Sequence, residues 1–377
     1  MKDTLSDVGR SEKRYYVVDH VTGRNRFGPC VQDQPVLAAD AIRFKGEPIV
    51  AVAAVDEDTA LEAVDKVKVD IEEQEGVFDP LEAMEPDSPK VSTAGNLYMV
   101  GESPWRKISF GDIDEGFREA DEIIEGEYKH PTVEHAQLEP QVSVAVPEAN
   151  GKLTIYSMCQ ALYWHQRMLS SVLQMPLNKV CLVGGTVGGG FGGKNDIHAD
   201  HVTAVLALKT GRPVKWRWTR EEELLYSTYR GAWNIRIKDG VKKNGRIVAR
   251  QIQGIREAGG YLGLTPYEVD KYAYYATGPY FIPNVHIEVC CVLTNKPPSG
   301  SMRGFGLTPS TFATEVQMNK IAAHLGTDPW EIRFINAYRE GDRTPTQSSL
   351  DSVAVIEVMQ SLAQQVGVDL PHRLRNM

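Results

Sequence analysis

The chain has 377 residues, of which 42% are hydrophobic and 24% charged, a balance that excludes a disordered or fibrous protein and predicts two or more packed units. Its net charge of −9 argues against binding to nucleic-acid phosphates, so we expect proteins and small molecules as partners. We find no signal peptide and no run of about 18 apolar residues, which predicts a cytoplasmic protein without a membrane span.

The cysteines limit the redox chemistry that this chain can carry alone. An iron–sulfur cluster needs about four suitably spaced thiolates. The five cysteines form no Cys-x-x-Cys pair, which is typical of a reducing compartment, and we expect no such cluster in this chain. They are Cys30, Cys159, Cys181, Cys290 and Cys291.

Residues 33–73 have the pattern of a compact β-α-β unit. The apolar run at 49–54 predicts a strand, Asp56 or Asp58 is placed to cap the helix that follows, and the alternation at 66–72 predicts a second strand. Residues 74–105 are rich in Pro, Glu, Ser and Gly and predict a connector. We therefore divide the chain into domains at 1–105 and 106–377.

The second domain has the pattern of an α+β fold. A short helix at 114–120 and a strand at 122–133 begin it. Further strands are predicted at 142–146, 153–158, 179–183, 213–219, 233–238 and 289–294, and helices at 161–173 and 200–209.

A longer helix is predicted at 309–325. It carries Phe312, Val316 and Ala323 on one face and ends at a glycine. An Asp-Pro pair shortly after this glycine predicts that another helix begins there, with the aspartate as its N-cap.

The most informative segment runs from Gly184 to Asn195 and reads GGTVGGGFGGKN, between a predicted strand and a predicted helix. Glycine lets the backbone approach a ligand closely and visit positive φ, so that successive N–H groups can converge on an anion or an oxo group. The segment therefore predicts a nest for an anion or a cofactor, whereas a flexible hinge would favour serine where Phe191 stands.

Two phosphate-binding motifs match this segment only formally. The P-loop pattern fails because Asn195 stands where a Ser or Thr hydroxyl should hold magnesium, and the dinucleotide pattern fails because no N-terminal βαβ unit with a ribose-binding acid accompanies it.

Four motifs together resemble the xanthine dehydrogenase and aldehyde oxidase family. The stretch GGGFGGK resembles the family's first molybdopterin-domain motif. The other three resemble its H-x-x-x-E-P stretch, the strand end whose glutamine reaches the molybdenum, and its R-G-F/Y-G signature, and they occur in the family order. They are EHAQLEP at 134–140, SMCQ at 157–160 and SGSMRGFG at 299–306.

This resemblance implies a hammerhead-like α/β domain at the N-terminus, followed by the first molybdopterin-binding α+β domain. It implies that Gln160 hydrogen-bonds an oxo or thio ligand of molybdenum, that the loop at Gly190, Phe191 and Gly192 faces the cofactor, and that Arg303 contacts it. The molybdenum is held by the sulfurs of the pterin, so no metal ligand is expected from the protein.

Plainer interpretations of these residues stay open. Gln160 is also suited to cap a strand end, Arg303 to form a surface salt bridge, and the two phenylalanines Phe191 and Phe305 to fill a core. For the His135 and Glu139 pair, a structural hydrogen-bonded role is favoured over a catalytic one.

For the substrate, the resemblance points to Asn195, Lys271 and Phe305. Purine-specific relatives carry an acid and an arginine at the positions that here are Asn195 and Lys271, so purine recognition is not expected. An aldehyde or an N-heterocycle, including a carboxylate of one, fits these residues equally well. Phe305 is expected beside the substrate ring.

The chain departs from the family at two places. The glutamate that serves as general base in the second molybdopterin domain is missing, so no catalytic residue is expected in this chain and a partner must supply the base. The start is short, because further strands normally precede a segment like the one that begins here at Val21.

The resemblance thus implies the molybdopterin-binding subunit of a molybdenum hydroxylase that uses water as its oxygen source. Its partners are a second molybdopterin-domain chain, an iron–sulfur subunit and an FAD subunit, to which the electrons pass. The alternative is a non-catalytic remnant or assembly partner, which the missing glutamate favours and the retained glycine loop opposes.

Overall fold

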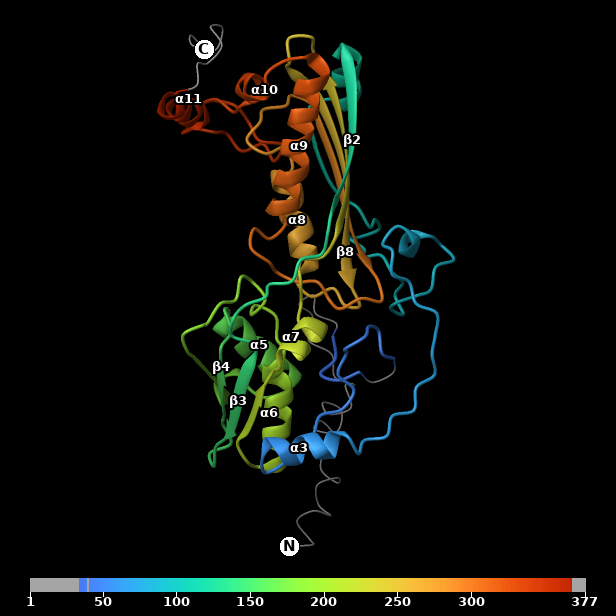
Figure 1. The fold of residues 1–377 in the computed structure, drawn as a ribbon, viewed down its shortest axis with the longest axis vertical. Helices are drawn as coiled ribbons and strands as arrows, with labels where there is room; N and C mark the ends of the chain where they lie inside the picture. The colour runs from blue at the N-terminus through green and yellow to red at the C-terminus, as the bar shows by residue number, and fades with distance from the viewer. Residues whose placement is uncertain (1–33, 39–40, 368–377) are drawn as a thin grey trace, which may run out of the picture.

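Two β-sheets organise the chain into two lobes, which the computed structural model shows stacked end to end (Figure 1). The structure describes residues 34–38 and 41–367. The larger sheet has the strand order β1-β9-β8-β7-β2 and is antiparallel except where β8 pairs with β9. Its strands are β1 (Arg106–Phe110), β2 (Glu122–His130), β7 (Trp233–Val241), β8 (Ile247–Gly259) and β9 (Val285–Leu293).

The smaller sheet has the order β5-β4-β3-β6, with β4 and β5 parallel. Its strands are β3 (Val142–Pro147), β4 (Leu153–Ser157), β5 (Val180–Gly184) and β6 (Val214–Arg217). All four overlap strands predicted from the sequence. The parallel pair matters for the site because it brings the end of β4 and the end of β5, where the glycine run begins, to the same edge.

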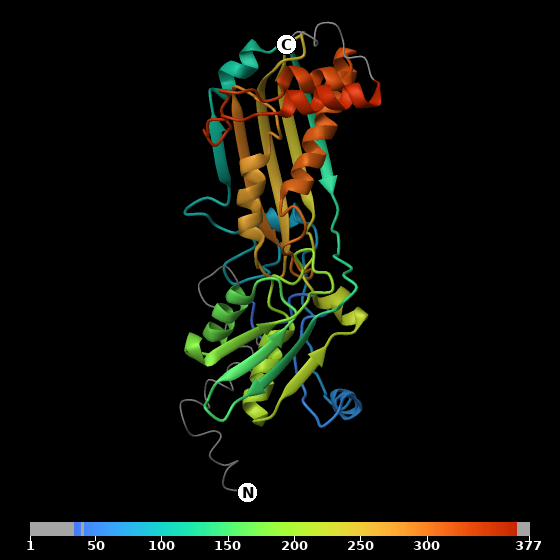
Figure 2. The same cartoon turned by 90° about the vertical axis from the view of Figure 1, so that its left-hand side faces the viewer.

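Helices cover one face of each sheet. α8 (Thr265–Tyr275) and α9 (Leu307–Leu325) pack along the larger sheet (Figures 1 and 2), while α5 (Leu162–Val172) and α6 (Ala199–Thr210) pack on the smaller one. Among the described residues, none of the helices combines the length and apolarity needed to cross a bilayer. The remaining helices are α3 (Glu57–Val64), η1 (Glu82–Met84), α4 (Ile113–Glu119), η2 (Leu177–Lys179), α7 (Arg220–Tyr226), α10 (Pro329–Asn336) and α11 (Val355–Val366).

The predicted helix ends are confirmed by their caps. Asp328 accepts from the backbone N–H of Trp330 at 2.8 Å and so begins α10. Gly211 and Gly326 end α6 and α9 with φ of +66° and +64°, a left-handed conformation that glycine adopts without steric cost. Local chemistry alone fixes these ends, which is why the sequence predicts them well.

The β-α-β unit predicted near the N-terminus is only partly confirmed. Asp56 caps α3, with Thr59 N–H donating to it at 2.8 Å, but residues 49–54 and 66–72 form no ladder with any described residue. Val69 and Ile71 are at least half exposed, so the alternation of apolar and polar residues occurs here without a partner strand. The hammerhead-like arrangement is therefore not seen in the described residues, and the segment from Val21 lies outside them.

The stretch before residue 106 packs on both lobes. Val36 and Leu37 join the core of the smaller sheet, whereas Val77, Ala83 and Val91 join the core of the larger one. The division between residues 105 and 106 remains a prediction, although regular pairing in the larger sheet does begin at Arg106.

The long helix α9 does not bury the apolar face that was predicted from its sequence. Phe312 and Val316 are about 40% exposed, while Ala313 and Ile321 are fully buried against the sheet. Hydrophobicity misled the prediction because the buried face also carries Gln317, whose amide donates to Asp239 at 2.9 Å.

Strand β8 escaped prediction for a related reason. Three of its charged side chains, Arg250, Arg256 and Glu257, are fully buried, so its sequence does not look like that of a central strand. Asp239 on β7 pairs with Arg250 through two hydrogen bonds of 2.7 and 3.0 Å. This compensation makes a charged central strand possible.

We predict that Asp239→Asn lowers the free energy of unfolding by about 3–5 kcal/mol, because it leaves the buried Arg250 guanidinium without its counter-charge. Arg236→Gln on the same strand is the matched control, since its pair with Glu127 is exposed and is worth less than about 1 kcal/mol. Urea unfolding of the full chain measures both. Equal losses for the two variants would contradict this account.

Candidate cofactor site between the lobes

A cavity of about 350 Å³ lies where the two lobes meet. The smaller lobe contributes a residue just after β4 and the loop after β5. The larger lobe contributes the segment that leads into α9. Residues from three of the four sequence motifs therefore converge from distant parts of the chain. The cavity is lined by Gln160, Phe191, Gly192, Asn195, Arg303 and Phe305 from the predicted set.

The two aromatic residues of the cavity have an unusual backbone. Phe191 and Phe305 adopt φ of +52° and +46°, a region that costs a non-glycine residue about 1–3 kcal/mol. Two hydrogen bonds hold this geometry: Arg303 N–H donates to the Phe191 carbonyl at 2.8 Å, and Phe305 N–H donates to the Met302 carbonyl at 2.7 Å. The first of these bonds joins the two lobes directly.

The glycines allow the walls of the cavity to touch each other. Gly192 has φ of +105°, and a Cβ there would lie 2.5 Å from the carbonyl oxygen of Ser301. A Cβ on Gly190 would overlap the side-chain amide of Gln160, and Gly190 itself is buried behind the cavity. The glycine run therefore lets the protein segments around the cavity contact each other closely. The exposure of the loop to a ligand is a consequence of this packing.

Gln160 has a fixed amide orientation. Its Oε1 accepts from Gly192 N–H at 2.9 Å and from Lys194 N–H at 3.3 Å, so its Nε2 is left to donate, and no acceptor for it exists among the described residues. The Gly192 N–H is consequently not free to face a ligand. The Phe191 N–H takes part in no hydrogen bond of the described chain.

Arg303 is the one charged residue among the described residues that line the cavity. Its side chain is exposed and makes no salt bridge with the described residues, so the alternative role as a surface salt-bridge partner is not seen there. Its carbonyl accepts from Thr308 Oγ at 3.1 Å and from the Arg230 guanidinium. The backbone of Arg303 is thus held while its guanidinium stays available for an anion.

The three expected substrate residues do not all meet. Asn195 donates to Ser301 Oγ at 3.3 Å and lines the cavity together with Phe305, but Lys271 does not line it. Lys271 lies on α8, whose buried face carries Glu268 and Tyr272, and the helical turn places Lys271 off that face. Sequence spacing before the R-G-F-G motif did not reveal this rotation.

An ion pair behind the glycine loop, between a buried lysine and a half-buried glutamate, was not predicted. Lys194 is fully buried, and its Nζ lies 2.6 Å from Glu139 Oε2, which also accepts from Gly188 N–H at 2.8 Å. His135 does not pair with Glu139; its Nε2–H donates to the Ser301 carbonyl at 2.8 Å instead, and burial lowers its pKa. The H-x-x-x-E-P stretch thus holds the glycine loop through Glu139 and the segment before α9 through His135.

Comparison with known proteins identifies the family of this chain. Residues 93–337 match the family of molybdopterin cofactor-binding domains. The nicotinate dehydrogenase large molybdopterin subunit of Eubacterium barkeri is 34% identical over 92% of this chain and 80% of its own length. The molybdenum-binding subunit of xanthine dehydrogenase from Escherichia coli O157:H7 is 31% identical over 81% of this chain and 40% of its own length.

A solved structure shows the same fold. The aldehyde oxidoreductase from Desulfovibrio gigas superposes with a TM-score of 0.87 and 28% identity, over 92% of this chain and 39% of that one. The chain belongs to the xanthine dehydrogenase and aldehyde oxidoreductase family and carries its molybdopterin-binding domain. It spans less than half the length of two of these three proteins.

We predict a pH signature for the ion pair behind the loop. Partial burial opposes ionisation of Glu139, but the hydrogen bonds from Lys194 and Gly188 outweigh it and hold the pKa below its ordinary value. A lowered folded pKa adds stability above the unfolded value of about 4.3, and this stability is lost as the pH falls through the folded pKa. Glu139→Gln should therefore destabilise the chain most near neutral pH and progressively less below about pH 4.

Urea unfolding at several pH values measures this difference. Glu221→Gln is the control, because its carboxylate is exposed and forms no ion pair with the described residues. A Glu139→Gln effect that stays constant from neutral pH to about pH 3 would show that the Lys194 pair does not stabilise the ionised form.

Proposed function

We propose that the cavity between the lobes holds the molybdopterin cofactor and that the chain is the cofactor-binding subunit of a hydroxylase acting on an aldehyde or an N-heterocycle. One observation carries this proposal: Gln160, the glycine loop and Arg303 converge on a single cavity. When bound, the cofactor supplies the two-electron oxidation, with water as the source of oxygen. Its molybdenum takes sulfur ligands from the pterin and needs none from the protein.

The donors of the cavity suit an oxo-rich, anionic group. Gln160 offers a neutral amide N–H₂, Phe191 a main-chain N–H, and Arg303 a planar guanidinium suited to phosphate. None of them has an acceptor among the described residues. These donors therefore remain for a ligand that brings many acceptors.

The general base must come from elsewhere. No carboxylate occurs among the described residues that line the cavity, and Asn195 and Gln160 do not act as bases. We assign this role to a second molybdopterin-domain chain, with iron–sulfur and FAD subunits as electron acceptors. The relative from Eubacterium barkeri is itself named as a large molybdopterin subunit, which supports such a division between subunits.

The substrate is proposed to enter between the two phenylalanines. Phe191 and Phe305 offer apolar surface to a flat ring, and Asn195 offers one amide within the same cavity. The relative from Eubacterium barkeri is named for nicotinate, an N-heterocyclic carboxylate. An aldehyde fits the same cavity, and a substrate panel on the assembled complex distinguishes the two classes.

In the assembled complex, we predict that Arg303→Ala lowers the molybdenum and pterin content per chain, because the guanidinium is the only charged group among the described lining residues. Gln160→Ala should keep the cofactor and lower kcat about 100-fold, as expected for the loss of one positioned donor. Arg236→Ala, an exposed arginine on β7, is the control. Full cofactor content and full kcat in both variants would remove the basis for the assignment.

We further predict that the chain loaded with cofactor but separated from its partners gives no turnover. Co-expression with the partner that carries the glutamate should restore turnover, and product formed in ¹⁸O-labelled water should carry the label. A purified complex that contains no molybdenum would favour the alternative of a non-catalytic assembly partner.

A further inference from the structure

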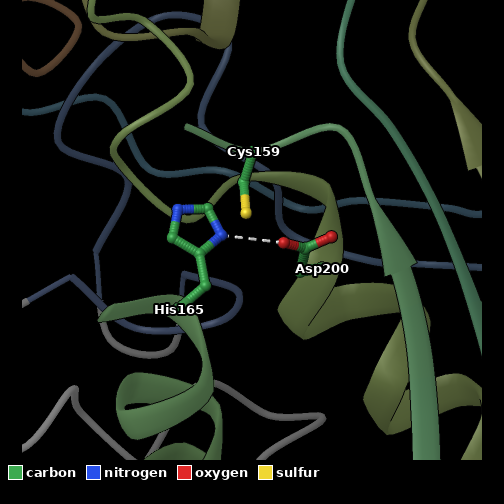
Figure 3. A group of neighbouring side chains, drawn as sticks. All are labelled: Cys159, His165 and Asp200. Carbon is green, nitrogen blue, oxygen red and sulfur yellow. Dashed lines mark hydrogen bonds and ion pairs between the residues drawn. The ribbon is translucent and has the colours of Figure 1, made fainter. Parts of the chain in front are cut away.

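A second group of reactive side chains lies directly behind the cavity wall. Cys159 follows β4, His165 belongs to α5 and Asp200 to α6, and Figure 3 shows the three side chains pointing toward one another. The thiol sulfur, a ring nitrogen and a carboxylate oxygen all lie within 4.8 Å of one another. The three residues are 7%, 2% and 3% exposed.

The histidine shows how this group is arranged. His165 Nε2 lies 3.0 Å from the Asn195 carbonyl and must donate to it, while Nδ1 lies 2.9 Å from Asp200 Oδ2. In Figure 3 the sulfur of Cys159 also lies on the Nδ1 side of the ring. A nucleophilic cysteine relay needs the thiol and the acid on opposite ring nitrogens, so this cluster is not arranged as one.

We propose that Cys159, His165 and Asp200 form a zinc site. Sulfur, imidazole nitrogen and carboxylate oxygen are the ligands that Zn²⁺ takes in proteins. A ligand histidine typically donates its other N–H to a carbonyl, as His165 does to Asn195, and a ligand carboxylate is typically held by a further hydrogen bond, as the Ser157 hydroxyl holds Asp200 at 2.7 Å. The fourth position falls to a water.

Charge balance is consistent with this proposal. A divalent cation with one thiolate, one carboxylate and a neutral imidazole has no net charge, which a fully buried site requires. The metal-free cluster balances equally well as an imidazolium between Asp200 and the Asn195 carbonyl, with a neutral thiol. The two states therefore differ in bound zinc and in the state of the Cys159 sulfur, and both differences can be measured.

The position of the site gives it a consequence for the cavity. Cys159 immediately precedes Gln160, and the ring of His165 holds the carbonyl of Asn195, so two cavity residues are attached to this cluster. A metal there would fix the end of β4 to the loop after the glycine run. The site is thus a structural support for the cavity, separate from the cofactor.

The test titrates the full chain, without an affinity tag, with Zn²⁺ or Co²⁺. We expect one metal ion per chain after dialysis, measured by elemental analysis, and a thiolate-to-cobalt charge-transfer band in the near ultraviolet. Cys159→Ser should abolish this band and weaken zinc binding by at least about 100-fold in competition with a chromophoric chelator. Cys181→Ser, an exposed cysteine on β5, should leave both unchanged.

Two results would overturn the proposal. One is a wild-type chain that binds neither ion stoichiometrically, a result that needs no variant to fold. The other is cobalt bound without the thiolate band, which would place the ion elsewhere. Circular dichroism checks that Cys159→Ser is folded, and the outcome does not depend on whether the molybdenum cofactor is loaded.

Discussion

The site depends on the contacts between the lobes, and among them the N–H of Arg303 donates to the carbonyl of Phe191 at 2.8 Å. Both partners belong to strained segments, since Phe191 and Phe305 have left-handed backbones. Such conformations persist only where the surroundings determine them fully. Here the loop after β5 and the segment before α9 hold each other in place, with Gly192 giving Ser301 the room it needs. The cavity is the space that remains where these two segments meet.

Buried charged side chains have partners inside the lobes, but two donors in the cavity lack them in the described part of the chain. In the interior, buried charges have partners, as Arg250 has in Asp239 and Lys194 in Glu139. In the cavity Arg303 and the amide N–H₂ of Gln160 have no acceptor among the described residues. Both side chains are exposed, so water satisfies their donors when no ligand is bound. The same donors are available to the anionic cofactor of the proposed function.

The lining of the cavity limits the chemistry that its own residues can perform. It supplies donors and apolar surface but no acid among its described lining residues, so it can hold and orient a ligand without accepting a proton from it. Under the proposed function, the lobes described here position the cofactor, and the general base is assigned to a second molybdopterin-domain chain.

Features that depend on neighbouring residues could be predicted from the sequence. They are the strands around the glycine run, the caps at Gly211 and Asp328, and the motifs that carry Gln160 and Arg303. Features that depend on distant partners became visible only in the folded chain. Strand β8 is hidden in the sequence because its buried charges are balanced from other elements, and the runs at 49–54 and 66–72 have the strand pattern without a described strand to pair with. Distant packing also decides two further features. It rotates Lys271 away from the cavity, and it brings Cys159, His165 and Asp200 together. Local propensity acts within a few residues, whereas pairing, burial and charge compensation are set by whichever segments the fold brings together.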